Sequence, residues 1–136
     1  KHLEELIENC VVKPMVNQIE TNPLCQDRAL IQFCQSNNIV IEAYAPFGSG
    51  ATGVLQNETI AAIAKKNNKS VGQIILRWMV QQGMIVLPKS SNPVRIKQNM
   101  SLFDFELSEE DMMEITALQG DNDECKRTCP APDSIL

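Results

Sequence analysis

Histidine and tyrosine each occur only once in the 136 residues of this sequence, and aromatic residues make up only 4% of it. With His2 as the single histidine, the sequence offers no set of histidine ligands of the kind that holds zinc, and we expect no metal site. No run approaches the roughly 18 uninterrupted apolar residues that a membrane-spanning helix requires, so we expect no membrane segment. The net charge of −5 argues against nucleic acid or an acidic membrane surface as the partner.

Cysteine is present in an odd number and at irregular spacing. The five cysteines are Cys10, Cys25, Cys34, Cys125 and Cys129. A small disulfide scaffold carries denser cysteines in an even number, so we interpret these residues as reduced thiols of a cytoplasmic protein. A disulfide between Cys125 and Cys129 in an oxidising compartment is the alternative.

The hydrophobic pattern alternates between strands and helices along the chain. Strands are predicted at 14–19, 39–45 and 84–88, and helices at 1–9, 26–36, 58–66, 71–82, from 93 onward and at 109–118. This order is typical of an α/β fold with a parallel sheet and crossover helices. Three strands leave two open edges and a poorly covered face. Because the chain also opens on KHLEEL, inside a helical pattern and without an initiator methionine, we expect it to be part of a larger protein.

Capping residues mark the beginning of three of these helices. Ser70 is a plausible N-cap, and Asn92 is followed by Pro93, which suits the first position of a helix because its missing N–H costs nothing there. Ser108, with Asp111 three residues later, resembles a capping box without its usual Glu or Gln. These signals place the helix starts more firmly than periodicity alone.

Cationic and hydroxyl side chains are grouped where the third predicted strand gives way to a helix. The stretch VLPKSSNPVRIKQN at 86–99 places Lys89, Ser90, Ser91 and Arg95 around the helix start at Asn92. A helix N-terminus with Lys and Arg beside it favours a phosphate group. The alternative is a capped surface helix with solvated charges, and these residues alone leave both open.

The order and spacing of three segments resemble those in the C-terminal half of the aldo-keto reductases: PMVNQIETNP, IVIEAYAPFGSG and IVLPKSSNPVRIKQNMSLFDFELSEEDM. The ending CPAPDSIL is similar to that of members with a short C-terminal loop. The resemblance implies a (β/α)8 TIM barrel, of which this chain would supply strands six to eight with their helices, incomplete on its own. Residues 1–119 would form this C-terminal half, and residues 120–136 the loop over the substrate pocket.

The same resemblance implies an NADPH site, and five residues would contact the middle and the reactive end of the cofactor. Gln18 would hydrogen-bond the nicotinamide carboxamide, and Tyr44 would stack its ring on the nicotinamide. Ala45 stands where many members have serine. Phe47 and Ser49 begin the loop that would cover the pyrophosphate.

At the other end of the cofactor, Lys89, Ser90 and Arg95 resemble the residues that hold the 2′-phosphate of NADPH. Asn99 would lie near the adenine, and Gln98 replaces a glutamate common at that position. The Lys and Arg pair favours NADPH over NADH.

No residue of this chain is assigned to proton transfer, because the catalytic aspartate, tyrosine, lysine and histidine of the family would lie upstream. In the family the tyrosine is the general acid. We expect the full-length protein to reduce small aldehydes or ketones and the chain alone to be inactive. Its partner would be the missing N-terminal half of the barrel. The alternative is a non-catalytic structural or assembly subunit whose open sheet is covered by a partner. We interpret Glu20 as a structural carboxylate and Trp78 as a core residue.

Overall fold

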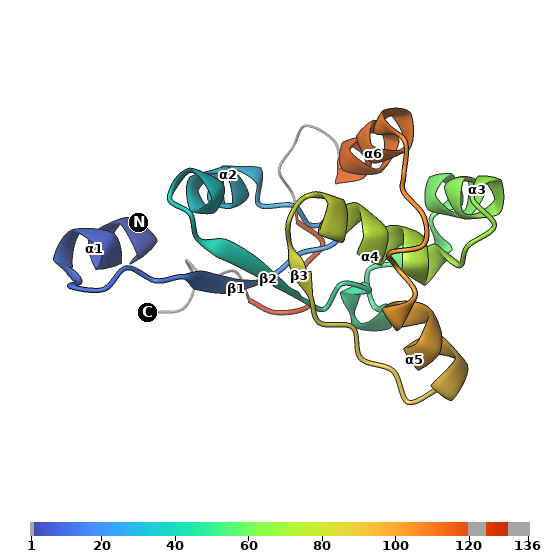
Figure 1. Ribbon diagram of the computed structural model, residues 1–136, viewed down its shortest axis with the longest axis horizontal. Coiled ribbons are helices and arrows are strands. Elements are labelled where there is room, and N and C mark those ends of the chain that lie inside the picture. The colour runs from blue at the N-terminus through green and yellow to red at the C-terminus, as the bar shows by residue number, and fades with distance from the viewer. Residues whose placement is uncertain (1, 120–124, 131–136) are drawn as a thin grey trace.

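The computed structural model describes residues 2–119 and 125–130 of the chain (Figure 1). Its helices are α1 (His2–Asn9), α2 (Arg28–Ser36), α3 (Glu58–Lys66), α4 (Val71–Gln81), α5 (Pro93–Met100) and α6 (Glu109–Thr116). Its strands are β1 (Val16–Glu20), β2 (Val40–Tyr44) and β3 (Ile85–Val86). Three short 3-10 turns complete the order: η1 (Gly48–Gly50), η2 (Val54–Gln56) and η3 (Ala117–Gln119). The predicted alternation of strands and helices is confirmed.

The three strands form one parallel sheet in which β2 lies between β1 and β3. Gln18 of β1 is in register with Glu42 of β2, and Glu20 is in register with Tyr44. Because side chains alternate across a strand, these four residues share one face of the sheet. All three strands also end on the same side, so the loops after β1, β2 and β3 lie near one another (Figure 1).

The other face of the sheet is covered by helices and forms the hydrophobic core. Ile41 and Ala43 of β2 are buried there, and α4 packs against α3, α5 and β3 (Figure 1). Trp78 of α4 is fully buried, and its Nε1 donates a hydrogen bond of 3.1 Å to Thr116 Oγ1 of α6. The interpretation of Trp78 as a core residue is confirmed.

The face that carries Gln18 and Glu42 is open at its amino-terminal end. Val16, Val40 and Ile85 lie on this face and are 48%, 40% and 47% exposed. Three apolar side chains in adjacent strands present a continuous apolar surface, which is uncommon at the centre of a sheet. These three side chains give the sheet an exposed apolar face.

Polar caps fix where the helices begin. Ser70 forms a complete capping box with Gln73, and Asn92 caps α5 with Pro93 in the first turn, as predicted. α2 begins at Arg28 rather than at residue 26 because the side chain of Asp27 accepts from Leu30 N at its N-terminus. None of the helices within residues 2–119 combines the length and the apolar character needed to cross a bilayer.

The capping box expected at α6 is only half formed. Ser108 Oγ accepts from Asp111 N, but the Asp111 carboxylate turns away to accept from Lys66 Nζ at 2.9 Å and from Asn67 Nδ2 at 3.4 Å. Burial by itself would raise the pKa of Asp111, but hydrogen bonds led by that from Lys66 hold it below its ordinary value. The carboxylate therefore ties α6 to the end of α3 instead of closing its own helix.

The third strand is shorter than the predicted span of 84–88. Only Ile85 and Val86 form it, although Leu87 N still donates to Ala43 O at 3.0 Å. Pro88 then ends the pairing because proline has no N–H to donate.

Candidate functional site

A cavity of about 320 Å³ lies where the loop after β2, the start of α4, the loop after β3 and helix α5 meet. Its lining residues are Phe47, Leu55, Gln56, Ser70, Val71, Gly72, Lys89, Ser90, Arg95, Gln98 and Asn99. Six of the residues selected from the sequence are therefore brought together in one cavity: Phe47, Lys89, Ser90, Arg95, Gln98 and Asn99. Segments more than forty positions apart in the chain contribute to it, so the fold rather than local sequence builds this site.

The charge of the cavity comes from two cations. Lys89 and Arg95 are both exposed, whereas Gln98 and Asn99 are half-buried. Within residues 2–119 and 125–130, neither cation has an acidic partner at ion-pair distance. An unpaired lysine and arginine beside a serine hydroxyl form a donor set suited to phosphate oxygens.

The backbone N–H groups at the start of α5 are less available than the sequence suggested. Asn92 Oδ1 accepts from Val94 N at 2.9 Å and from Arg95 N at 3.3 Å, and Ser90 Oγ accepts from Asn92 N at 3.1 Å. The N-terminus of α5 therefore contributes less to a phosphate site than the sequence suggested, because the Asn92 side chain already uses the N–H groups of Val94 and Arg95. An anion would be held here by side chains.

The loop after β2 is tightly wound. Ala45 and Ser49 both have φ of 48°, in the left-handed region that non-glycine residues rarely occupy. Gly48 has φ of 59°, and a Cβ at this position would lie 1.9 Å from Thr52 Oγ1, so only glycine fits. This loop presents Phe47 to the cavity, while Ala45 and Ser49 do not line it.

A second group of selected residues lies on the open face of the sheet. Gln18 Nε2 donates a hydrogen bond of 2.5 Å to Glu42 Oε2 on the adjacent strand. Because an ionised carboxylate only accepts, this contact turns the NH₂ of Gln18 toward Glu42 and leaves its amide oxygen free to accept from another donor. Glu42 was missed from the sequence, although its position two residues before Tyr44 placed it on the same face.

Tyr44 ends β2 beside the C-terminal tail. Burial, followed by contacts with the thiol of Cys129 and the charge of Glu20, raises the pKa of Tyr44 to about 12. A phenol is already protonated at pH 7 at its ordinary pKa, and this shift keeps Tyr44 neutral in more alkaline solution as well. Neither Gln18 nor Tyr44 lines the cavity around Lys89.

The described part of the tail, residues 125–130, is held at the carboxyl end of β1. Glu20 is 2% exposed, and its carboxylate accepts from Thr128 N at 2.6 Å, Thr128 Oγ1 at 2.7 Å and Cys129 N at 3.0 Å. Arg127 pairs with Asp27 at 3.5 Å. These contacts agree with a structural role for Glu20. The rest of the span 120–136, expected to overhang the pocket, lies outside the described residues.

The residues that line the cavity are not all those that were selected from the sequence. Ser91 is exposed and lies outside the cavity lining. Conversely, Ser70, Val71 and Gly72 line it from the start of α4, and sequence reasoning identified Ser70 only as a helix cap. In the part of the chain that the structure describes, no three His, Cys, Asp or Glu side chains are grouped as metal ligands would be.

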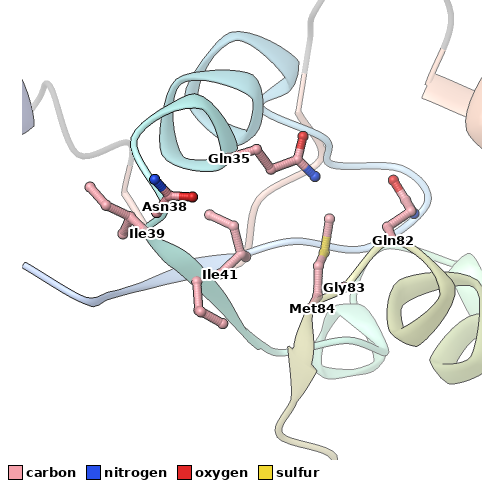
Figure 2. Close-up of a pocket in the computed structure, with 8 residues that line it drawn as sticks. Gln35, Asn38, Ile39, Ile41, Gln82, Gly83 and Met84 are labelled. Atoms are coloured by element: carbon pink, nitrogen blue, oxygen red, sulfur yellow. The ribbon is translucent and has the colours of Figure 1, made fainter.

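A larger cavity, of about 430 Å³, lies at the opposite end of the sheet, between the C-terminal ends of α2 and α4 (Figure 2). Ile39, Ile41 and Met84 give it apolar walls, and Gln35 and Gln82 lie at its edge. None of its lining residues is ionisable, and it lies at the amino-terminal ends of β2 and β3. Functional sites of parallel α/β folds form at the carboxyl ends of the strands, so we do not include this cavity in the candidate site.

One expected result follows from the contact between Gln18 and Glu42. If Gln18 holds the nicotinamide carboxamide, as the family resemblance implies, Glu42→Ala in the full-length protein should raise the Kd for NADPH about three- to tenfold, because one hydrogen bond that orients Gln18 is lost. Glu42→Gln should have a smaller effect, since its amide oxygen can still accept from Gln18. Fluorescence titration measures both, with Glu8→Ala, an exposed change on α1, as the control. Unchanged affinity in Glu42→Ala would contradict the positioning role.

Comparison with known proteins places these features in a family. The sequence pattern of the Aldo/keto reductase family matches residues 1–119. The chain is 46% identical over 136 residues to the 9,11-endoperoxide prostaglandin H2 reductase of Trypanosoma cruzi, covering 99% of this chain and 47% of that protein. It is 45% identical over 135 residues to the glyoxal reductase of Bacillus subtilis, again covering 99% of this chain and 47% of the relative. The chain thus spans about half the length of these curated relatives.

A solved structure agrees with this assignment. The crystal structure of a Gox0644 mutant in complex with NADPH superimposes with a TM-score of 0.81 at 42% identity, covering 86% of this chain and 42% of that one. The α/β fold described above is therefore that of a (β/α)8 barrel family. From the match over residues 1–119 and this structural likeness, the chain belongs to the aldo/keto reductase family.

Proposed function

We propose that this chain is the cofactor-binding half of an NADPH-dependent aldo-keto reductase, which reduces aldehydes or ketones to alcohols. In this proposal β1, β2 and β3 are strands six to eight of the barrel, and the open sheet face around Val16, Val40 and Ile85 looks into its interior. The observation that carries the proposal is the single cavity in which Lys89, Arg95 and four further selected residues converge.

The residues present fit the cofactor. Lys89, Ser90 and Arg95 would hold the 2′-phosphate that distinguishes NADPH from NADH, and Gln98 and Asn99 would lie beside the adenine. A volume of about 320 Å³ is near the lower end for a small-molecule site, so the cavity suits the adenosine phosphate end rather than the whole dinucleotide.

The opposite end of the cofactor would lie across the carboxyl ends of β1 and β2. Gln18, oriented by Glu42, would accept from the carboxamide, and the neutral ring of Tyr44 would pack against the nicotinamide. When bound, NADPH supplies the hydride. The protein must give a proton to the carbonyl oxygen, and we propose that this group belongs to the part of the protein that precedes Lys1.

The proposal is tested on the full-length protein by titration with NADPH and by NADPH oxidation in the presence of small aldehydes and ketones. Saturable NADPH binding and aldehyde-dependent oxidation are the expected results. Because one of the relatives is named a glyoxal reductase, small dicarbonyl compounds are a sensible first panel of substrates. Folded protein that binds no NADPH would overturn the proposal. That result would favour the alternative function, a non-catalytic structural or assembly subunit. The exposed apolar face of the sheet is the observation that supports this alternative.

A further inference from the structure

Three of the five cysteines gather at the carboxyl end of β1. Cys25 is fully buried in the loop that follows this strand, and Cys125 and Cys129 belong to the tail. The thiol of Cys125 contacts that of Cys25, whereas the thiol of Cys129 contacts the hydroxyl of Tyr44. All five cysteines are free thiols in the structure. Cys125 therefore has Cys25 as a thiol neighbour, whereas Cys129, its partner in the alternative considered from the sequence, contacts Tyr44.

The backbone explains why Cys25 and Cys125 meet. Lys126 N donates to Leu24 O at 3.1 Å, and Thr128 N donates to the Glu20 carboxylate at 2.6 Å, so the residues next to Cys25 and Cys125 are held together. Residues 22–25 form a tight turn in which Asn22 and Cys25 bond each other, and the hydrogen bond to Leu24 places Cys125 beside that turn.

Contacts on both sides keep the two thiols together. The Glu20 carboxylate holds Thr128 and Cys129 by three hydrogen bonds, and Arg127 reaches back to Asp27. The tail therefore does not need to move far for a bond to form between the two sulfur atoms.

We propose that Cys25 and Cys125 are a redox pair that forms an intramolecular disulfide in the presence of a peroxide and ties the tail to the loop after β1. Cys125 is partly exposed and Cys25 fully buried, so peroxide reaches Cys125 first. Burial and the neighbouring Cys125 thiol raise the pKa of Cys25 well above its ordinary value, so little of it is thiolate and it is not the thiol that reacts with peroxide.

The chemistry balances with one peroxide. The Cys125 thiolate attacks a peroxide oxygen, so an S–O bond forms, the O–O bond breaks and hydroxide leaves, taking up the proton of the thiol as water. The sulfur of Cys25 then attacks the Cys125 sulfur. The S–S bond forms, the S–O bond breaks, and the proton of Cys25 leaves with that oxygen as a second water. Two thiols are oxidised by two electrons in total, and hydrogen peroxide is reduced to two waters.

The disulfide has one consequence that rests on the proposed function. It would fix Cys129 beside Tyr44, the residue that we place against the nicotinamide. Because the disulfide would add a covalent restraint to the tail beside this end of the cofactor, NADPH should dissociate more slowly from the oxidised protein. Formation of the disulfide itself does not depend on cofactor binding or on activity.

The test uses the full-length protein, first reduced and then treated with hydrogen peroxide. Remaining thiols are alkylated, and the digested protein is analysed by mass spectrometry. A cross-linked peptide joining Cys25 to Cys125 is expected in the wild type and in Cys129→Ser, and it should be absent from Cys125→Ser. Cys125→Ser changes a partly exposed tail residue, and circular dichroism checks that it folds.

Three results would overturn the proposal. They are a cross-link between Cys125 and Cys129, sulfinic acid on Cys125 with Cys25 still alkylated, and no cross-link at any peroxide concentration that leaves the protein folded. Because the readout is a peptide mass, these results are independent of whether the protein is a reductase. Stopped-flow release of NADPH from the reduced and oxidised proteins then tests the consequence separately.

Discussion

Arg95→Ala in the full-length protein should weaken NADPH binding roughly 10- to 100-fold and leave NADH binding nearly unchanged. Arg95 is an exposed cation at the cavity, without an acidic partner in the described part of the chain. Its loss would remove a charge-assisted contact to the 2′-phosphate, which NADH lacks. Fluorescence titration with each cofactor measures the two affinities under the same conditions.

Helix α5 offers a matched control for this experiment. Lys97 is also an exposed cation of α5, but it does not line the cavity, so Lys97→Ala should change neither affinity. Lys89→Ala, like Arg95→Ala, should weaken NADPH binding and leave NADH binding nearly unchanged. Raising the salt concentration should narrow the difference between NADPH and NADH, because the contact is exposed and screened. Equal losses for both cofactors, or an equal loss in Lys97→Ala, would rule out phosphate recognition by Arg95.

Trp78→Ala is expected to lower the free energy of unfolding by about 3–5 kcal/mol. The indole is fully buried on α4, and its Nε1 bonds Thr116 of α6, so the substitution leaves a large cavity between two helices. Urea unfolding of the full-length protein, followed by circular dichroism, gives the difference. A loss of this size is a large part of the stability of an ordinary domain, and the variant will express poorly if the protein is marginal.

Trp78→Phe keeps the prediction testable if the alanine variant does not fold. It retains most of the ring volume and should cost about 1–2 kcal/mol, mainly through the lost hydrogen bond. Thr116 Oγ1 still donates to Met112 O at 2.7 Å in that variant, so the hydroxyl is not left without a partner. Phe103→Ala, at a side chain 78% exposed, should change stability by less than about 0.5 kcal/mol. Comparable losses at Phe103 and Trp78 would contradict the assignment of the core.

Features set by neighbours in the sequence were predictable. The caps at Ser70 and Asn92 and the buried stripe of α4 were found because each depends on residues within one or two helical turns. Gly83, with φ of 78°, follows α4 as expected of a glycine beyond a helix end. The alternation of strands and helices along the chain was enough to predict a parallel sheet.

Features set by tertiary contacts were not predictable from local patterns. Asp111 has the spacing of a capping residue, but its carboxylate accepts a hydrogen bond from Lys66, which lies 45 positions earlier in the chain, instead of capping its own helix. Likewise, Glu42 orients Gln18 only because β1 and β2 pair in one particular register. The cavity wall from Ser70 to Gly72 could not be found because it depends on how α4 and α5 pack.

The cap at Asn92 has a consequence for how cofactor preference can evolve. Asn92 satisfies the first turn of α5 by itself, so the helix does not need Lys89 or Arg95 in order to form. Both cations are exposed, and surface substitutions of this kind cost little stability. On the proposed function, selection could therefore exchange one nicotinamide cofactor for the other by changing two side chains, while the backbone that presents them stays intact.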